Sequence, residues 1–107
     1  MDRRQHPRLV GPFQARWQAS SGAAQRCRVG DLSLGGCFVH SQTTPRPGTA
    51  VTVTIDLDGE PSAPLAGIVV HEEWSDGFAL RFGTLDAARR SSLRTLMGRL
   101  REIRRSA

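Results

Sequence analysis

The sequence predicts a six-stranded antiparallel, Greek-key-like β-barrel with one C-terminal α-helix. Three observations predict it: short segments of alternating apolar and polar residues, glycine- and proline-rich breaks between them, and a helical spacing of leucines near the C-terminus. A chain of 107 residues suits one domain with one modest core. We therefore interpret residues 1–107 as a single domain, with an N-terminal arm over 1–12, a barrel over 13–83 and a helix over 84–105.

Six segments have the pattern of short strands. In FQARWQAS, Phe13, Ala15 and Trp17 alternate with polar residues, as in a half-buried strand. AVTVTIDL alternates in the same way and is rich in β-branched residues. Turn signals such as TTPRPG and DGEPSAP separate the segments. The expected strands are residues 13–20, 25–32, 36–41, 50–57, 65–74 and 78–82.

The last segment changes to the period of a helix. Its apolar residues form one stripe at i, i+3, i+4 and i+7 spacing, namely Leu93, Leu96, Met97, Leu100 and Ile103. Thr84 or Asp86 could cap the start of this helix. We expect the stripe to pack across an open side of the barrel; a role in self-association is the alternative.

The positive charge belongs to the C-terminal segment. The net charge is +5, and every basic residue is arginine. Residues 84–107 carry seven arginines and two acids, whereas residues 1–83 carry eight of each. A nucleic-acid-binding barrel would instead place basic residues across the fold and aromatic residues on an exposed strand. With six aromatic residues and no tyrosine, the sequence does not favour that class.

Residues suited to catalysis or metal binding do not gather in a pattern. His6, His40 and His71 are scattered along the chain. Glu72 and Glu73 are adjacent, so on a strand they would face opposite sides. DLSLGG lacks the lysine and the following helix of a phosphate-binding P-loop. We therefore expect no enzyme, no metal site and no cofactor.

The cysteines and the apolar pattern indicate the compartment. Cys27 and Cys37 form one pair without a second, which favours small buried thiols over a disulfide or a zinc site. The sequence has no apolar run of about 18 residues that could cross a membrane. The charged N-terminus also lacks the apolar region of a secretory signal. We expect a cytoplasmic protein without membrane insertion.

The segment RRQHPR, at positions 3–8, concentrates three arginines ahead of the first strand. Guanidinium groups bind phosphate oxygens in pairs, read the O6 and N7 atoms of guanine, and stack on purines. Arg3, Arg4 and Arg8 would therefore suit a compact ligand with phosphates and purines. Taken alone, the segment also fits a solvated basic arm.

The segment DLSLGG, at positions 31–36, has complementary chemistry. Asp31 can accept two hydrogen bonds from the N1 and N2 edge of a guanine. Ser33 would point to the same face if the backbone stays extended. Gly35 and Gly36 permit positive φ and close approach of a ligand. Taken alone, this segment also fits a plain turn between strands.

Together the two segments resemble the signatures of PilZ domains. Arg4 and Arg8 form Arg-x-x-x-Arg, and Asp31, Ser33 and Gly36 form Asp-x-Ser-x-x-Gly, in the order and separation of that family. DGFALRF near the end of the predicted barrel also resembles the family's final strand, so the resemblance covers essentially the whole chain. It implies a non-enzymatic receptor for the bacterial second messenger cyclic di-GMP.

The resemblance also implies how the ligand is held. The arm would fold over the ligand and become ordered as it closes. Arg4 and Arg8 would contact phosphates and guanine faces, and Arg3 would assist. The aspartate and serine would read a guanine edge, and Gly36 would give clearance. Trp74 matches a position where some members place a residue against the ligand, and it fits a core or rim tryptophan equally well. The implied ligand-binding residues are Arg3, Arg4, Arg8, Asp31, Ser33, Gly35, Gly36 and Trp74.

Two other functions remain open. One is a small barrel that binds RNA or DNA through the arm and the arginine-rich helix. The other is a PilZ-like module that makes protein contacts without binding the messenger. On the favoured interpretation, a monomer or weak homodimer binds one cyclic di-GMP or a stacked pair and relays the signal to a downstream protein that the sequence does not name.

Overall fold

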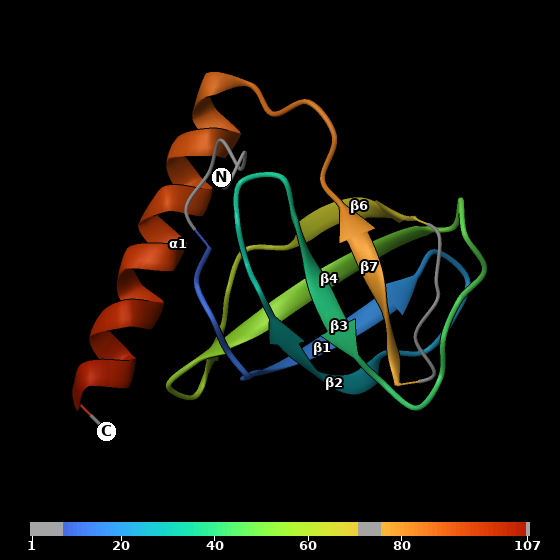
Figure 1. The fold of residues 1–107 in the computed structure, drawn as a ribbon, viewed down its shortest axis with the longest axis horizontal. Helices are drawn as coiled ribbons and strands as arrows, with labels where there is room; N and C mark the ends of the chain where they lie inside the picture. Colours follow the sequence, from blue (N-terminus) through green and yellow to red (C-terminus); the bar gives the residue numbers. More distant parts are fainter. Residues whose placement is uncertain (1–7, 71–75, 107) are drawn as a thin grey trace, which may run out of the picture.

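The computed structural model describes residues 8–70 and 76–106, which form seven strands and one helix (Figure 1). In chain order, these elements are β1 Phe13–Ala19, β2 Gln25–Gly30, β3 Gly36–His40, β4 Ala50–Leu57, β5 Glu60–Pro61, β6 Leu65–Val69, β7 Gly77–Arg81 and α1 Ala87–Ser106. Six of the strands and the helix correspond to the predicted elements. The fold class predicted from the sequence is confirmed.

The six longer strands form a closed antiparallel barrel. Their order is β1-β2-β3-β7-β6-β4, and β4 pairs with β1 to close the ring. Ala15 shows the closure, because it lies opposite Cys27 on β2 and opposite Ile55 on β4. The first four strands therefore lie in the order 4-1-2-3, which is a Greek key.

Three of the differences from the predicted boundaries are larger than one residue. β2 ends at Gly30, because Asp31 leaves the extended conformation with a φ of 50°. β6 ends at Val69, and residues 71–74 of the predicted strand lie outside the described residues. The helix begins at Ala87, since the Oδ1 atom of Asp86 accepts a hydrogen bond from the Arg89 amide at 2.8 Å and so caps its first turn.

The extra strand, β5, lies where the sequence predicted only a turn. Asp58 and Gly59 have φ values of 57° and 98°, and the Gly59 amide donates to the Oδ1 atom of Asp56 at 2.8 Å. This tight turn reverses the chain, so that Glu60 and Pro61 pair with the end of β4. Two residues are too few to show a strand period in the sequence.

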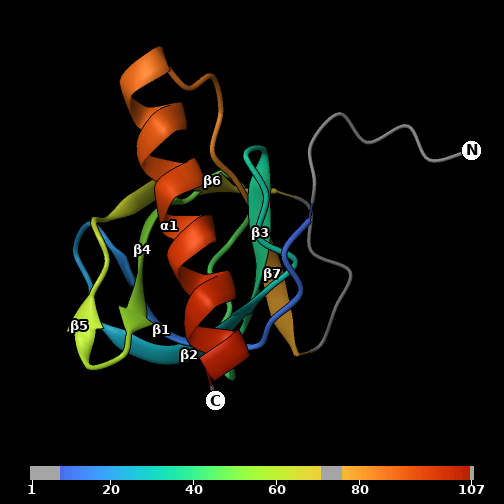
Figure 2. The same cartoon turned by 90° about the vertical axis from the view of Figure 1, so that its left-hand side faces the viewer.

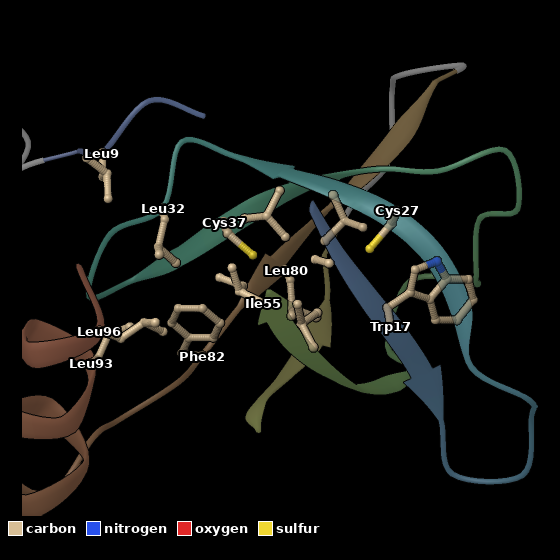
Figure 3. Packing of buried hydrophobic residues seen from close by; sticks show 14 of the residues in the cluster. Leu9, Trp17, Cys27, Leu32, Cys37, Ile55, Leu80, Phe82, Leu93 and Leu96 are labelled. Atoms are coloured by element: carbon tan, nitrogen blue, oxygen red, sulfur yellow. The ribbon is translucent and has the colours of Figure 1, made fainter. Parts of the chain in front are cut away.

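The core fills the barrel and continues to its helix-covered end (Figure 3). Trp17 packs edge-on against Phe78, with ring centroids 5.4 Å apart. Its indole N–H donates to the Oγ atom of Ser41 at 2.9 Å, which satisfies both buried polar groups. Cys27 and Cys37 are buried free thiols, as predicted. Burial raises the pKa of Cys37 to about 12 and that of Cys27 to about 11.

The helix lies across one end of the barrel (Figures 1 and 2). Leu93 and Leu96 lie beside Phe82 (Figure 3), and Met97 and Leu100 are buried with them. The predicted apolar stripe is therefore part of the core. No helix in the described part of the chain is both long and apolar enough to cross a membrane.

Candidate ligand-binding site

The end of the N-terminal arm is hydrogen-bonded to the β2–β3 loop. The Leu9 amide donates to the Leu32 carbonyl at 2.8 Å, and the Leu32 amide donates back to the Leu9 carbonyl at 2.9 Å. Both side chains are buried, so the pairing is anchored in the core (Figure 3). Because Arg8 and Asp31 each precede one of the paired leucines, the bridge brings the end of one motif to the start of the other.

Asp31 provides the acidic group of this region. Its side chain is partly exposed beside a cavity of about 320 Å³, whose described walls include the segment that follows the arm bridge. Gly35 and Gly36, which permit positive φ, do not adopt it, and the left-handed residue of the motif is Asp31. Aspartate tolerates this conformation better than most residues, since its short polar side chain can bond locally.

Ser33 shapes the β2–β3 loop. Its amide donates to the Gly36 carbonyl at 2.9 Å, and its Oγ atom accepts a hydrogen bond from the Gly35 amide at 3.2 Å. The same hydroxyl lies 3.4 Å from the Gly36 carbonyl and donates to it. The extended backbone assumed for Asp31 and Ser33 is therefore not present, and the serine hydroxyl is engaged inside the loop.

The two motif glycines differ in what surrounds them. A Cβ atom on Gly36 would lie 2.1 Å from the Leu80 carbonyl oxygen, so only glycine lets β3 approach β7 at this point. A Cβ atom on Gly35 would lie 3.8 Å from the Ser33 hydroxyl, which is ordinary contact. The space beside Gly36, which was expected to accommodate the ligand, is therefore filled by β7.

Arg28 and His40 also line the cavity beside Asp31. They lie directly opposite each other on β2 and β3, and both are exposed on the outer face of the barrel. The Nδ1 atom of His40 lies 4.0 Å from the Oδ2 atom of Asp76. The alternation of β2 and β3 could have placed both side chains outside, but only the register shows that they adjoin Asp31.

Arg104, in the last turn of α1, holds the segment that follows the bridge. Its guanidinium group donates to the carbonyls of Val10 and Gly11, the latter at 3.1 Å, and lies 5.6 Å from the centroid of the Phe13 ring. In Figure 1 this segment lies between α1 and β3, and in Figure 2 it lies on the same side of α1 as β3. Sequence reasoning missed this contact, since no pattern relates residues at opposite ends of the chain.

The structure thus brings together part of the predicted site. Arg8, exposed, lies next to the bridge that joins the arm to the Asp31–Gly36 loop. Arg3, Arg4 and Trp74 lie outside the described residues. No cluster of three or more potential metal ligands occurs among residues 8–70 and 76–106. The described groups offer cationic donors, one carboxylate and backbone groups around a surface cavity, which is the chemistry of a binding site for a polar anion.

Solved structures with the same fold include three bacterial proteins. The PilZ domain of CeSA from a cellulose-synthesizing bacterium is 21% identical, with a TM-score of 0.67 and coverage of 89% of this chain and 98% of that one. The PilZ domain of YcgR from Escherichia coli, solved with c-di-GMP, is 16% identical, with a TM-score of 0.72 and coverage of 98% and 97%. The Bacillus subtilis inhibitor of motility, MotI/DgrA, is 17% identical, with a TM-score of 0.66 and coverage of 98% and 54%.

The sequence comparisons identify the family directly. A search of curated protein sequences finds no match. The family model for the PilZ domain matches residues 2–99, which include both motifs, all the strands and most of α1. The chain therefore belongs to the PilZ domain family.

Proposed function

We propose that this PilZ domain is a non-enzymatic receptor for cyclic di-GMP. The observation that carries the proposal is the double hydrogen bond between Leu9 and Leu32, which holds the end of the arginine arm against the loop that begins with Asp31. A ligand bound there would meet cationic donors and an acidic acceptor at once. The solved complex of YcgR with c-di-GMP, which has the same fold, supports this choice of ligand.

The chemistry of cyclic di-GMP matches the groups at this site. The ligand carries two phosphates and two guanines. Arg8, with Arg3 and Arg4, would bind phosphate oxygens and guanine faces through planar guanidinium groups. Asp31 would accept hydrogen bonds from the N1 and N2 atoms of one guanine.

The remaining motif residues have a supporting role in this proposal. Ser33 and Gly36 fix the loop and its attachment to β7, and so set the direction of Asp31. Gly35, which is exposed, leaves the loop open to the ligand. Trp74 would contact the ligand, as the match to its position in some family members implies.

The signal would leave through α1. Arg104 connects this helix to the segment that follows the arm bridge. A ligand that reorders the arm would displace the segment that Arg104 holds. This displacement would shift the C-terminal end of α1. We propose that a downstream protein reads this change.

Calorimetric titration of the full chain with cyclic di-GMP tests the proposal, with GTP and a short RNA as controls. We expect cyclic di-GMP to bind with a dissociation constant of about 1 μM or less, or about −8 kcal/mol. GTP and RNA should bind much more weakly. No heat and no change in thermal stability at high cyclic di-GMP concentration would contradict the receptor function and favour a module that makes protein contacts only.

One observation favours nucleic acid as a second candidate ligand. Arg16 and Arg26 lie opposite each other on β1 and β2, and Arg28 lies two residues further along β2. These three exposed arginines form a basic strip on the outer face of the barrel. Tight binding of the control RNA, lost in Arg26→Ala and strongly weakened by salt, would support this second function.

A further inference from the structure

We propose that a groove between α1 and residues 62–66, which lead from β5 into β6, binds a partner protein. The partner would insert an extended peptide that carries both acidic and apolar side chains. The groove has a volume of about 420 Å³. In Figure 2, α1 lies between β5 on one side and β3 with the described part of the arm on the other, so the groove and the candidate ligand site are separated by the helix. This inference goes beyond messenger binding and does not depend on it.

The floor of the groove is apolar because the helix does not fully close the end of the barrel. Its apolar lining consists mainly of Leu57, Leu65, Phe82, Leu85, Leu93 and Leu96. On the helix, Ala88, Ser92 and Thr95 form the wall beside the buried stripe, and these small side chains leave the space unfilled. An apolar side chain from a partner would bury surface there that the chain itself leaves open.

The rim of the groove selects for negative charge. Arg89 and Arg99 line it from α1, and none of the described lining residues is acidic. The segment over residues 84–107 carries seven arginines and two acids, so a second copy of this helix would be repelled from the groove. An acidic partner segment is therefore favoured over self-association.

The backbone N–H and C=O of Ala66, on β6, can pair with another chain on the groove side. The Val69 amide bonds to Thr49 on the β4 side, and the Val70 amide bonds to Ala79 on β7. Because successive residues of a strand point their amides to opposite sides, Ala66 points its N–H and C=O toward the β7 side. The pairing of β6 with β7 stops at Ile68, so Ala66 presents these groups to an extended segment in the groove.

The test uses peptide probes with the full chain and no nucleotide, so its result does not bear on cyclic di-GMP binding. Short acetylated and amidated peptides in which glutamate alternates with leucine are titrated and followed by amide NMR. We expect changes at the amides of residues 63, 65, 66 and 88–99. Peptides in which lysine replaces glutamate should not bind. Equal binding of both peptides, or no binding of the acidic one, would overturn the proposal.

Three charge reversals that change the net charge by the same amount identify where the peptide binds. Arg89→Glu and Arg99→Glu should each weaken the acidic peptide about tenfold or more. Arg94→Glu, an exposed helix position that does not line the groove, should leave affinity nearly unchanged. Equal losses in all three variants would show a diffuse charge effect and overturn the proposal.

Two tryptophan substitutions, one inside the groove and one beside it, test whether the peptide occupies the groove. Ala88 and Ala87 are adjacent and exposed, but only Ala88 lines the groove. Ala88→Trp should abolish peptide binding, and Ala87→Trp should preserve it. Undiminished binding to Ala88→Trp would place the peptide elsewhere. Changes at the same amides with anionic phosphatidylglycerol vesicles but not with the peptide would assign the groove to lipid, and so contradict a protein partner.

Discussion

At the scale of single residues, Asp31 combines a backbone role with a proposed ligand role. Its left-handed backbone ends β2 and starts the loop, and its carboxylate is the acidic group beside the cavity. Residue type and motif order could single out Asp31 and Arg8 from the sequence. They could not show that the Ser33 hydroxyl turns into the loop. The prediction that Ser33 and Asp31 share a face assumed an extended backbone, which Asp31 interrupts.

Two substitutions separate the roles of Asp31. Asparagine tolerates the left-handed conformation, so Asp31→Asn should keep the thermal stability of the protein. It should still cost about 2–3 kcal/mol of cyclic di-GMP binding, because an amide cannot accept both guanine hydrogen bonds. Asp31→Ala should lose the same binding and also about 1 kcal/mol of unfolding free energy. Calorimetry and thermal unfolding measure the two effects, and full binding by Asp31→Asn would remove this carboxylate from the site.

The two motif glycines give a matched pair for stability. Gly36→Ala should lower the free energy of unfolding by about 1–3 kcal/mol, because its Cβ atom would collide with the Leu80 carbonyl on β7. Gly35→Ala, where the space is open, should change it by less than about 0.5 kcal/mol. Denaturant unfolding gives both values. Equal effects would mean that the β3–β7 approach does not require glycine.

At the scale of elements, alternation and period predicted the six barrel strands and the helix because each is long enough to repeat its pattern. β5 has two residues, and its pairing depends on the turn through Asp58 and Gly59. The bridge between Leu9 and Leu32 is a single pair between distant residues, so it has no period at all. The contact of Arg104 with the arm segment is likewise set by the tertiary fold alone.

Arg104 offers a direct test of how α1 and the arm are linked. Arg104→Ala should remove two hydrogen bonds to the chain at Val10 and Gly11. The amides of Leu9 and Leu32 should then exchange hydrogen faster, since the bridge opens more often. Arg105→Ala, in the same turn, is the control and should leave their exchange unchanged. Unchanged exchange in Arg104→Ala would mean that the helix does not stabilise the bridge.

At the scale of the whole molecule, the helix completes the core while its arginines remain at the surface. Leu93, Leu96, Met97 and Leu100 are buried with the barrel residues. The stripe in the sequence predicted this packing, because four such side chains cannot remain in water without cost. The sequence could not show which end of the barrel is covered, since that depends on where β7 directs the chain.

Truncation measures what the helix contributes to folding. Burial of these four side chains contributes about 6–10 kcal/mol before entropy is counted, which is comparable to the stability of a whole domain. Deletion of residues 92–107 should therefore abolish cooperative unfolding or cause aggregation. Circular dichroism and gel filtration measure both properties. A truncated chain that stays folded and monomeric would show that the helix is an added element and not part of the core.

We propose one site for cyclic di-GMP, formed by the arm and the Asp31 loop together. Its most direct test is the calorimetric affinity of Arg8→Ala compared with Arg94→Ala, an exposed arginine on α1. Arg8→Ala should lose about 2–3 kcal/mol of binding, as expected when a charge-assisted contact is removed. Arg94→Ala should bind like the unmodified protein. Equal losses would point to a diffuse electrostatic surface, and undiminished binding by Arg8→Ala would contradict a site at the arm.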